Sequence, residues 1–369
     1  MPLPGRRKVN GYGLRAAGFV LLVAILFGLN VWIEGPNFDL SIERILLNVG
    51  LGIIQAVALN IVNGFTGQFS LGHIGFYAVG AYVTASLGTF GHDRLFSFLP
   101  ADGSEVPLVT SIYPVLFMTL MSGLAAALLG LLLGLPSLRL RGDYLAIVTL
   151  GFAQIVQVVL LNLDIVNGNT SFTGIVRTHM IGGVPTPVTI AIPQLTVFFW
   201  VYVFVAIVIA VSLCLRFSNH GLAFMAVRDD EIAAEAMGIN TTRYKVTAFV
   251  LSAFFTGIAG SLFALYQSQL SNSQFDFIHG IYPVVMVVLG GLGSVSGVAI
   301  AAVILGVLPE SLRALGDYQL VVYPLLLILL MLTRPQGIFG REELSVAWFK
   351  GQIAAVAGWR RKGRTAVQP

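Results

Sequence analysis

Residues 218–245 read SNHGLAFMAVRDDEIAAEAMGINTTRYK and form a long polar stretch between two strongly apolar segments. The pattern predicts an amphipathic surface helix that ends at Gly238-Ile239-Asn240, because glycine and asparagine are common helix stops. Its charged group and its small apolar face consist of Arg228, Asp229, Asp230, Glu231 and Glu235, and of Ile232, Ala233, Ala236 and Met237. We expect a membrane protein to use such a helix to pass force or information to a soluble partner.

The composition places the chain among integral membrane proteins. Of its 369 residues, 56% are hydrophobic and 10% are charged, whereas a soluble domain carries roughly 25% charged residues. A membrane-spanning helix needs about 20 apolar residues, so there is room for about eight to ten spans. No separate enzyme domain fits, and we expect no cofactor and no metal. The single cysteine, Cys214, excludes a disulfide within the chain and is expected to be a packed thiol.

Nine apolar segments follow one another along the chain: residues 16–33, 45–62, 71–90, 111–134, 144–163, 194–215, 246–267, 281–309 and 318–333. The first follows a basic stretch and lacks a cleavage pattern, so it is expected to be an uncleaved span. Nine spans would export the basic tail, against the tendency of lysine and arginine to remain in the cytoplasm. Segment 281–309 carries four glycines near its middle, and dividing it there gives ten elements.

Ten elements put both termini in the cytoplasm. In that arrangement 17 of the 21 lysine and arginine residues are cytoplasmic. The expected organisation is a cytoplasmic N-terminal segment (1–15), a transmembrane domain (16–333) that includes a cytoplasmic segment (216–245), and a cytoplasmic basic tail (334–369). The tail either lies on membrane lipid, with its basic residues near anionic headgroups, or is partly disordered.

Two segments interrupt helical regularity at membrane depth, residues 63–73 and 290–297. Irregular backbone in a bilayer is tolerated where it is buried in protein or lines a cavity, and transporters use broken helices to bind solutes. The predicted fold is therefore all-α, a polytopic membrane protein of about ten transmembrane elements with broken helices. The translocation candidates are Asn60, Asn63, Gly67, Gln68, Ser70, Gly72, His73, Gln154, Gln157, Gly290, Gly291 and Gly293.

The polar residues within the spans are mostly neutral amides. Ion-driven pumps usually need buried ionisable groups, and His73 is the one histidine near a span interior. A hydrogen-bonded structural role is the better interpretation of His73 than proton transfer. The amides bind either solute or neighbouring helices. Small residues four apart, at 80, 84 and 88, at 130 and 134, and at 253, 257 and 261, predict close helix packing.

Five blocks in order resemble a permease subunit of the branched-chain amino acid ABC transporters: GFTGQFSLGHIGFYAVGAY (64–82), GDYLAIVTLGF (142–152), AVRDDEIAAEAMGIN (226–240), VVLGGLGSVSG (287–297) and RPQGIFG (334–340). The resemblance covers about residues 40–340 and is to the M-type subunit of the high-affinity systems. It implies a type II importer permease in the bacterial inner membrane. Such a permease assembles with a second related permease, two ATPase subunits and a periplasmic substrate-binding protein, and with no nucleic acid.

The resemblance also implies that residues 229–238 are the helix that couples the permease to its ATPase. The coupling candidates are Arg228, Asp229, Asp230, Glu231, Ala233, Ala234, Glu235, Ala236, Met237 and Gly238. Ile232 occupies the position of the glutamate in the importer motif, so that role is assigned to no single residue. Segment 167–182 is longer than in related permeases. The chain lacks a G-x-x-x-x-G-K-[ST] phosphate loop and must take its energy from a partner.

Other functions remain open at this point. A permease for urea or short amides belongs to the same class of machine, and neutral amides suit such a solute. A stand-alone channel or secondary carrier is disfavoured by the lack of charge within the spans. A membrane scaffold with a docking helix is disfavoured by the two breaks.

Overall fold

A computed structural model describes residues 28, 40–95, 108–137, 143–163, 171–181, 184–191, 197–267, 269–333 and 337. Apart from Gly28, the first expected span (16–33) lies outside the described residues. The basic tail (334–369) lies outside them too, apart from Gly337.

The described part of the chain is mostly helical, as expected. Its helices are α2 (Leu40–Asn60), α3 (His73–Phe90), α4 (His92–Leu95), α5 (Leu108–Ser137), α6 (Asp143–Leu161), α7 (Phe198–Arg216), α8 (Asn219–Asp229), α9 (Glu231–Ala236), α10 (Thr241–Tyr266), α11 (Phe277–Gly290), α12 (Val295–Ser311) and α13 (Gln319–Thr333). A π-helix covers Ile61–Phe65, and 3-10 helices cover Asn272–Phe275 and Arg313–Tyr318.

Six helical stretches among the described residues are long and apolar enough to cross a bilayer. They are Ser41–Phe65, Ile112–Leu135, Tyr144–Leu161, Phe198–Arg216, Thr241–Tyr266 and Asn272–Gly290, and α12 is a shorter apolar helix. A multi-pass membrane fold is confirmed. The arrangement of ten elements stays a prediction.

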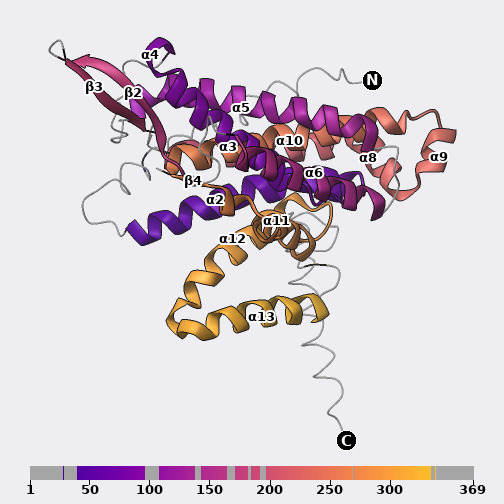
Figure 1. Cartoon of the computed structure of the whole chain (residues 1–369). Helices are drawn as coiled ribbons and strands as arrows, with labels where there is room; N and C mark the ends of the chain where they lie inside the picture. The colour runs from indigo at the N-terminus through magenta and orange to yellow at the C-terminus, as the bar shows by residue number, and fades with distance from the viewer. Residues whose placement is uncertain are drawn as a thin grey trace, which may run out of the picture.

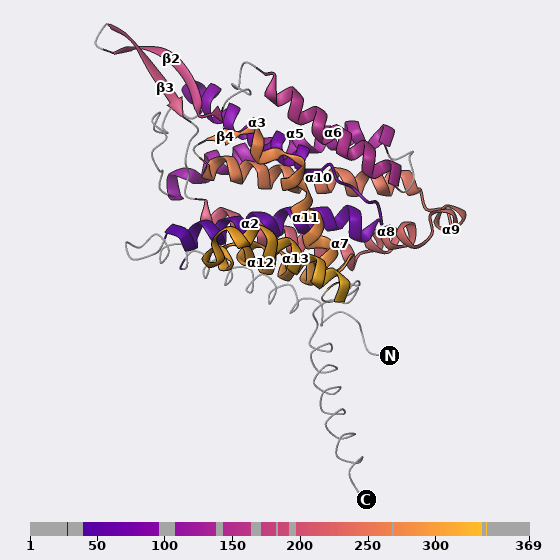
Figure 2. The same cartoon turned by 60° about the horizontal axis from the view of Figure 1, so that its bottom comes forward.

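The long helices α2, α3, α5, α6 and α10 run side by side along the bundle (Figures 1 and 2). Helices α8 and α9 lie at one end of the bundle, here called the coupling end. The β2–β3 hairpin lies at the opposite end, here called the hairpin end. The fold therefore has two structurally distinct ends.

The hairpin corrects the all-α expectation. Strands β2 (Gly174–Ile181) and β3 (Val184–Ala191) pair antiparallel from Gly174↔Ala191 to Ile181↔Val184. Two prolines and the β-branched residues of β3 explain the extended backbone, since proline interrupts helices and Val, Ile and Thr favour strands. A second antiparallel pair joins β1 (Ser171–Phe172) to β4 (Leu270–Ser271). This pair ties the base of the hairpin to the segment after α10.

Helices α3, α5 and α10 form the tightest part of the core, as the small residues predict. A Cβ on Gly80 of α3 would lie 2.1 Å from the carbonyl oxygen of Gly257 on α10. The Thr84 hydroxyl donates to Ser261 Oγ at 2.6 Å and lies 2.7 Å from Ser122 Oγ on α5. All three hydroxyl residues are buried. The three helices are thus joined by backbone contact and by a hydroxyl chain.

The apolar stretch 281–309 is divided as predicted. Helix α11 ends at Gly290 and α12 begins at Val295, with Ser294 capping α12 by accepting from the Gly297 amide. Gly291 and Gly293 between them have φ angles of 104° and 92°, a left-handed region that favours glycine. Here the segment 290–294 is called the second break.

Residues 61–72 depart from α-helix as predicted and are here called the first break. The π-helix continues α2 to Phe65, and Gly67 then adopts a φ of 68°. Regular α-helix resumes at His73. π-Helical turns inside helices are rare and are frequent at functional sites.

The polar segment 218–245 contains two helices, so the single helix expected there is wrong. Asp230 has an extended backbone, ends α8, and caps α9 by accepting from the amides of Ile232 and Ala233. A carboxylate at this position satisfies amides that an uninterrupted helix would bond internally, so it favours a new start. The expectation for Cys214 is also wrong, because its side chain is exposed.

Candidate functional site

The two breaks meet at the coupling end of α2. Asn60 Oδ1 accepts a hydrogen bond of 2.9 Å from the Gly293 amide, and Asn60 Nδ2 donates to the Ser294 carbonyl at 3.3 Å. A Cβ on Gly64 would lie 2.5 Å from the Gly293 nitrogen. One buried amide side chain thus fixes the second break against the first.

Two arginines bind the same breaks from the neighbouring polar segment. Arg216, the last residue of α7, donates from Nη1 to the Gly293 carbonyl at 2.5 Å. Arg228, in the last turn of α8, donates from Nη1 to the Gly64 carbonyl at 3.0 Å and from Nε to Asp229 at 3.2 Å. The Arg228 side chain is 17% exposed, so these charge-assisted bonds are partly shielded from water.

Further along the first break, His73 has the structural role that its sequence context favoured. Its Nε2 lies 2.6 Å from Ser252 Oγ, and that hydroxyl donates to the Ala58 carbonyl at 2.5 Å. The Ser252 proton is therefore committed, so Nε2 carries the imidazole proton and donates it. The other nitrogen, Nδ1, lies 3.2 Å from Ser70 Oγ. The ring thus links α2, α3 and α10.

The first break retains unused hydrogen-bonding capacity. Gln68 is 6% exposed, and both of its amide atoms are buried without a partner among the described residues. Asn63 accepts from the Ser70 amide at 3.1 Å, but its Nδ2 is likewise unpartnered within that part of the chain. Buried polar groups are normally paired, so these two side chains mark a place where another arrangement or a bound group would be favourable.

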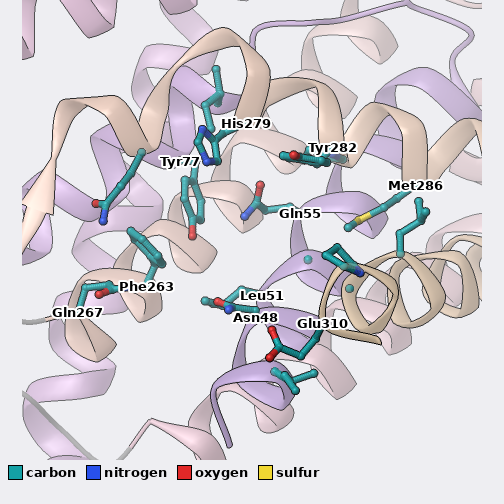
Figure 3. Close-up of a pocket in the computed structure, with 18 residues that line it drawn as sticks. Asn48, Leu51, Gln55, Tyr77, Phe263, Gln267, His279, Tyr282, Met286 and Glu310 are labelled. Atoms are coloured by element: carbon teal, nitrogen blue, oxygen red, sulfur yellow. The ribbon is translucent and has the colours of Figure 1, made fainter. Parts of the chain in front are cut away.

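A cavity of about 480 Å³ opens between α2, α3, α10, α11 and α12 (Figure 3). Figure 3 shows Gln55 between Phe263 and Gln267 on one side of the view and Met286 on the other. The lining consists of Ile45, Asn48, Leu51, Gly52, Gln55, Ile74, Tyr77, Phe263, Gln267, Gln274, His279, Tyr282, Pro283, Met286, Leu305, Gly306, Pro309 and Glu310. Apolar walls with a few convergent amides and hydroxyls are typical of small-molecule sites.

None of the twelve translocation candidates lines this cavity. Most of them build the first and second breaks, which follow the cavity-lining residues of α2 and α11 along the chain. Gln55, the cavity residue on α2 nearest to Asn60, precedes it by five residues, or about 7.5 Å along a helix. Gln154 and Gln157 are on α6, which lies mostly outside the buried core and contributes no residue to the cavity.

The cavity residues that sequence reasoning missed had a weak signal. Tyr77, Tyr282 and Met286 look like ordinary residues of apolar spans, and only tertiary packing gathers them. Gln267, Gln274 and His279 are polar residues at span ends, which sequence reading assigns to the interface with water. Asn48 and Gln55 were recognisable as amides within a span, but nothing in the sequence joins them to α11.

Helix α9 presents an apolar face outward. Ile232 and Met237 are 68% and 82% exposed, and Ala233 and Ala236 are exposed with them. Gly238, with a φ of 84°, ends the helix as predicted: its amide bonds the Glu235 carbonyl and the Ile239 amide bonds the Ala234 carbonyl. An exposed apolar face on a short, firmly capped helix is suited to contact with another protein.

Three of the coupling candidates face the rest of the chain. Ala234 is 4% exposed, Glu231 forms an ion pair with Lys245, and Glu235 accepts from the Thr241 hydroxyl at 2.6 Å. Both carboxylates thereby fasten α9 to the start of α10.

Comparison with known proteins agrees with the sequence motifs. The chain matches the family described as "Branched-chain amino acid transport system / permease component" over residues 41–333. It is 36% identical over 326 residues to the high-affinity branched-chain amino acid transport system permease protein LivM of Salmonella typhimurium (strain LT2), covering 81% of this chain and 70% of that protein. No solved structure matches the chain.

Two further relatives extend the comparison. The probable branched-chain amino acid transport permease protein LivM of Methanocaldococcus jannaschii is 25% identical over 354 residues, covering 86% of this chain and 98% of that protein. The permease protein LivH of Salmonella typhimurium is 36% identical over 148 residues, covering 39% and 47%. The family match contains both breaks, the cavity and the polar segment 218–245. The chain therefore belongs to the family of permease components of branched-chain amino acid transport systems.

Proposed function

We propose that this chain is one permease of a type II ABC importer that carries leucine, isoleucine and valine across the bacterial inner membrane. A second related permease, two ATPase subunits and a periplasmic binding protein would complete the machine. Family membership and the names of the relatives support this proposal. The observation that carries it is the cavity, combined with the exposed apolar face of α9 at the coupling end.

The cavity has the chemistry of an amino acid with an aliphatic side chain. The amides of Asn48, Gln55 and Gln267 supply donors and acceptors for an ammonium and a carboxylate. Leu51 and Met286 supply apolar contact for the side chain. A volume of about 480 Å³ falls within the range of about 300–1,000 Å³ that is common for small-molecule sites.

Energy would enter through α9. Its exposed face, Ile232, Ala233, Ala236 and Met237, would pack against an ATPase subunit, and closure of the ATPases would displace α8 and α9. Lysine and arginine are enriched in the cytoplasmic loops of membrane proteins. The positions of Arg216, Arg228, Arg243 and Lys245 at the coupling end therefore support a cytoplasmic location for that end. The N-terminal segment 1–15 and the basic tail 334–369 would be on the same side.

Permeation of urea or short amides is the alternative that the amides of the cavity favour. Against it, the apolar part of the lining would leave a small, strongly hydrated solute poorly compensated for its lost water. Uptake measurements with the assembled importer in proteoliposomes separate the two. We expect competition by leucine, isoleucine and valine against labelled leucine and none by excess urea. ATP-dependent urea uptake without leucine uptake would reject the proposed solute.

A further inference from the structure

Two arginines, at the end of α7 and in the last turn of α8, bind the two breaks. Arg216 holds the second break at the Gly293 carbonyl, and Arg228 holds the first break at the Gly64 carbonyl. Asn60 then joins Gly293 back to α2. The two arginines, here called the arginine bracket, therefore belong to one closed chain of contacts that includes both breaks and helix α8.

The backbone of the first break also lies directly on the stem of Arg228. A Cβ on Gly67 would be 2.6 Å from Arg228 Cγ and 3.4 Å from Arg228 Cβ. Only Asp229 separates Arg228 from Asp230, the residue that caps α9. A displacement of α9 thus reaches Arg228 through two peptide units, and Arg228 contacts the break by packing as well as by its hydrogen bond.

We propose that Arg216 and Arg228 are positioning residues that transmit movement of α9 to both breaks, and so to the ends of the cavity-lining helices α2 and α11. This inference rests on the proposed importer function and adds the residues that connect its two parts. A guanidinium suits the role because its planar donors keep a fixed direction, whereas an ammonium on a flexible stem does not.

The unpartnered amides next to the bracket favour a second arrangement of the first break. Gln68 and the Nδ2 group of Asn63 are buried beside Gly67 and Gly64 without partners among the described residues. A shift of the break that offers them backbone carbonyls or water would relieve that cost. The charged group that contacts Arg228 is Asp229, at 3.2 Å, and it moves with α8.

The test compares three variants of the full importer in proteoliposomes: Arg228→Met, Arg216→Met and the matched control Arg243→Met. Arg243 is an exposed arginine at the same end of the bundle, at the start of α10. We expect both bracket variants to bind the ATPase, and the quantity compared is the ratio of stimulated to basal ATP hydrolysis within each complex. Stimulation by loaded binding protein should fall at least about fivefold, the lower range of allosteric couplings, and Arg243→Met should behave as wild type.

Stimulation within about twofold of wild type in both bracket variants would overturn the proposal. Loss of ATPase binding by these variants would overturn it too, because the arginines would then serve folding or docking. If wild type responds to a binding protein loaded with another solute and not to leucine, the proposed solute fails. The comparison between variants is unaffected.

A cysteine pair tests transmission without relying on loss of function. In a Cys214→Ala background, the double variant Gly67→Cys and Arg228→Cys places two Cβ atoms 3.4 Å apart. Disulfides usually have Cβ–Cβ distances of about 3.5–4.5 Å. Reduced protein lacks the bracket contact and should be uncoupled, and oxidation should restore stimulation by replacing that contact with a covalent bond. An oxidised pair that stays uncoupled would contradict rigid transmission.

Discussion

The side chain of Asn60 holds the backbone of Gly293, which lies 233 residues further along the chain, through a 2.9 Å hydrogen bond. Two segments that the sequence presents as separate interruptions are therefore one structural unit. The contact joins an amide side chain to a backbone amide, and neither group titrates, so it is insensitive to pH.

Replacement of Asn60 by leucine should destabilise the folded chain. The Gly293 amide would remain buried without its acceptor, which costs about 1–3 kcal/mol. The melting temperature of the purified permease in detergent should fall, while Asn162→Leu, at an exposed side chain near the end of α6, should leave it almost unchanged. Equal melting temperatures for Asn60→Leu and wild type would show that the contact between the breaks adds no stability.

Gly72→Leu should abolish uptake while leaving membrane insertion intact. A Cβ at this position would lie 2.4 Å from the Thr149 carbonyl oxygen, so the side chain forces α6 away from the end of the first break. Labelled solute uptake and the amount of protein in the membrane fraction measure the two effects. Normal uptake by this variant would mean that the close approach is incidental.

Gly52→Leu should block the cavity without weakening α2. A Cβ there meets the flexible end of Met286 at 3.3 Å, and leucine is a better helix former than glycine by about 1 kcal/mol. Overfilling costs about 1–3 kcal/mol, equivalent to a loss of about 5–150-fold in solute affinity. Gly151→Leu on α6, where no atom lies within 4 Å, is the matched control. Solute uptake that responds equally to both changes would remove the cavity from the pathway.

Ala233→Arg should separate the permease from its ATPase. If the exposed face of α9 is buried on assembly, an uncompensated charge there costs about 3–5 kcal/mol, enough to weaken association more than about a hundredfold. Co-purification with the ATPase and solute-stimulated ATP hydrolysis should both be lost, and Thr242→Arg at a neighbouring exposed position should retain both. Retention of both by Ala233→Arg would identify α9 as a solvated face.

Cysteine labelling should assign the two ends to opposite sides of the membrane. In a Cys214→Ala background, a cysteine at Thr178 in the hairpin should react with a membrane-impermeant thiol reagent added to sealed cells. A cysteine at Gln352 in the tail should react only after the cells are opened. Labelling of the tail cysteine in intact cells would refute the cytoplasmic placement of the C-terminus.

Local chemistry allowed the second break to be predicted. Gly291 and Gly293 adopt backbone angles that glycine favours, and residues 290–297 are rich in glycine. The end of α9 at Gly238 was predictable for the same reason. Each of these features depends on residues within a few positions of one another, which is the range over which sequence patterns are informative.

The division at Asp230 and the cavity were less accessible from the sequence. Asp230 lies within residues 222–237, which contain no glycine or proline, and its extended backbone shows that it ends one helix and caps a second. The cavity depends on how α2, α11 and α12 pack, so Gln55 and Tyr282 meet across more than two hundred residues. The pattern of residues within α2 or within α11 does not indicate that the two helices pack together.

The backbone contact between Gly80 and Gly257 has a consequence for how the machine can move. Helices α3 and α10 touch without intervening side chains, and the hydroxyls of Thr84, Ser122 and Ser261 extend the contact to α5. Sliding α3 along α10 would break the backbone contact and the Thr84–Ser261 hydrogen bond together, and sliding α5 would break the Thr84–Ser122 contact. The trio should therefore remain a static frame throughout a transport cycle, and we expect the displacement that changes access in the helices around it.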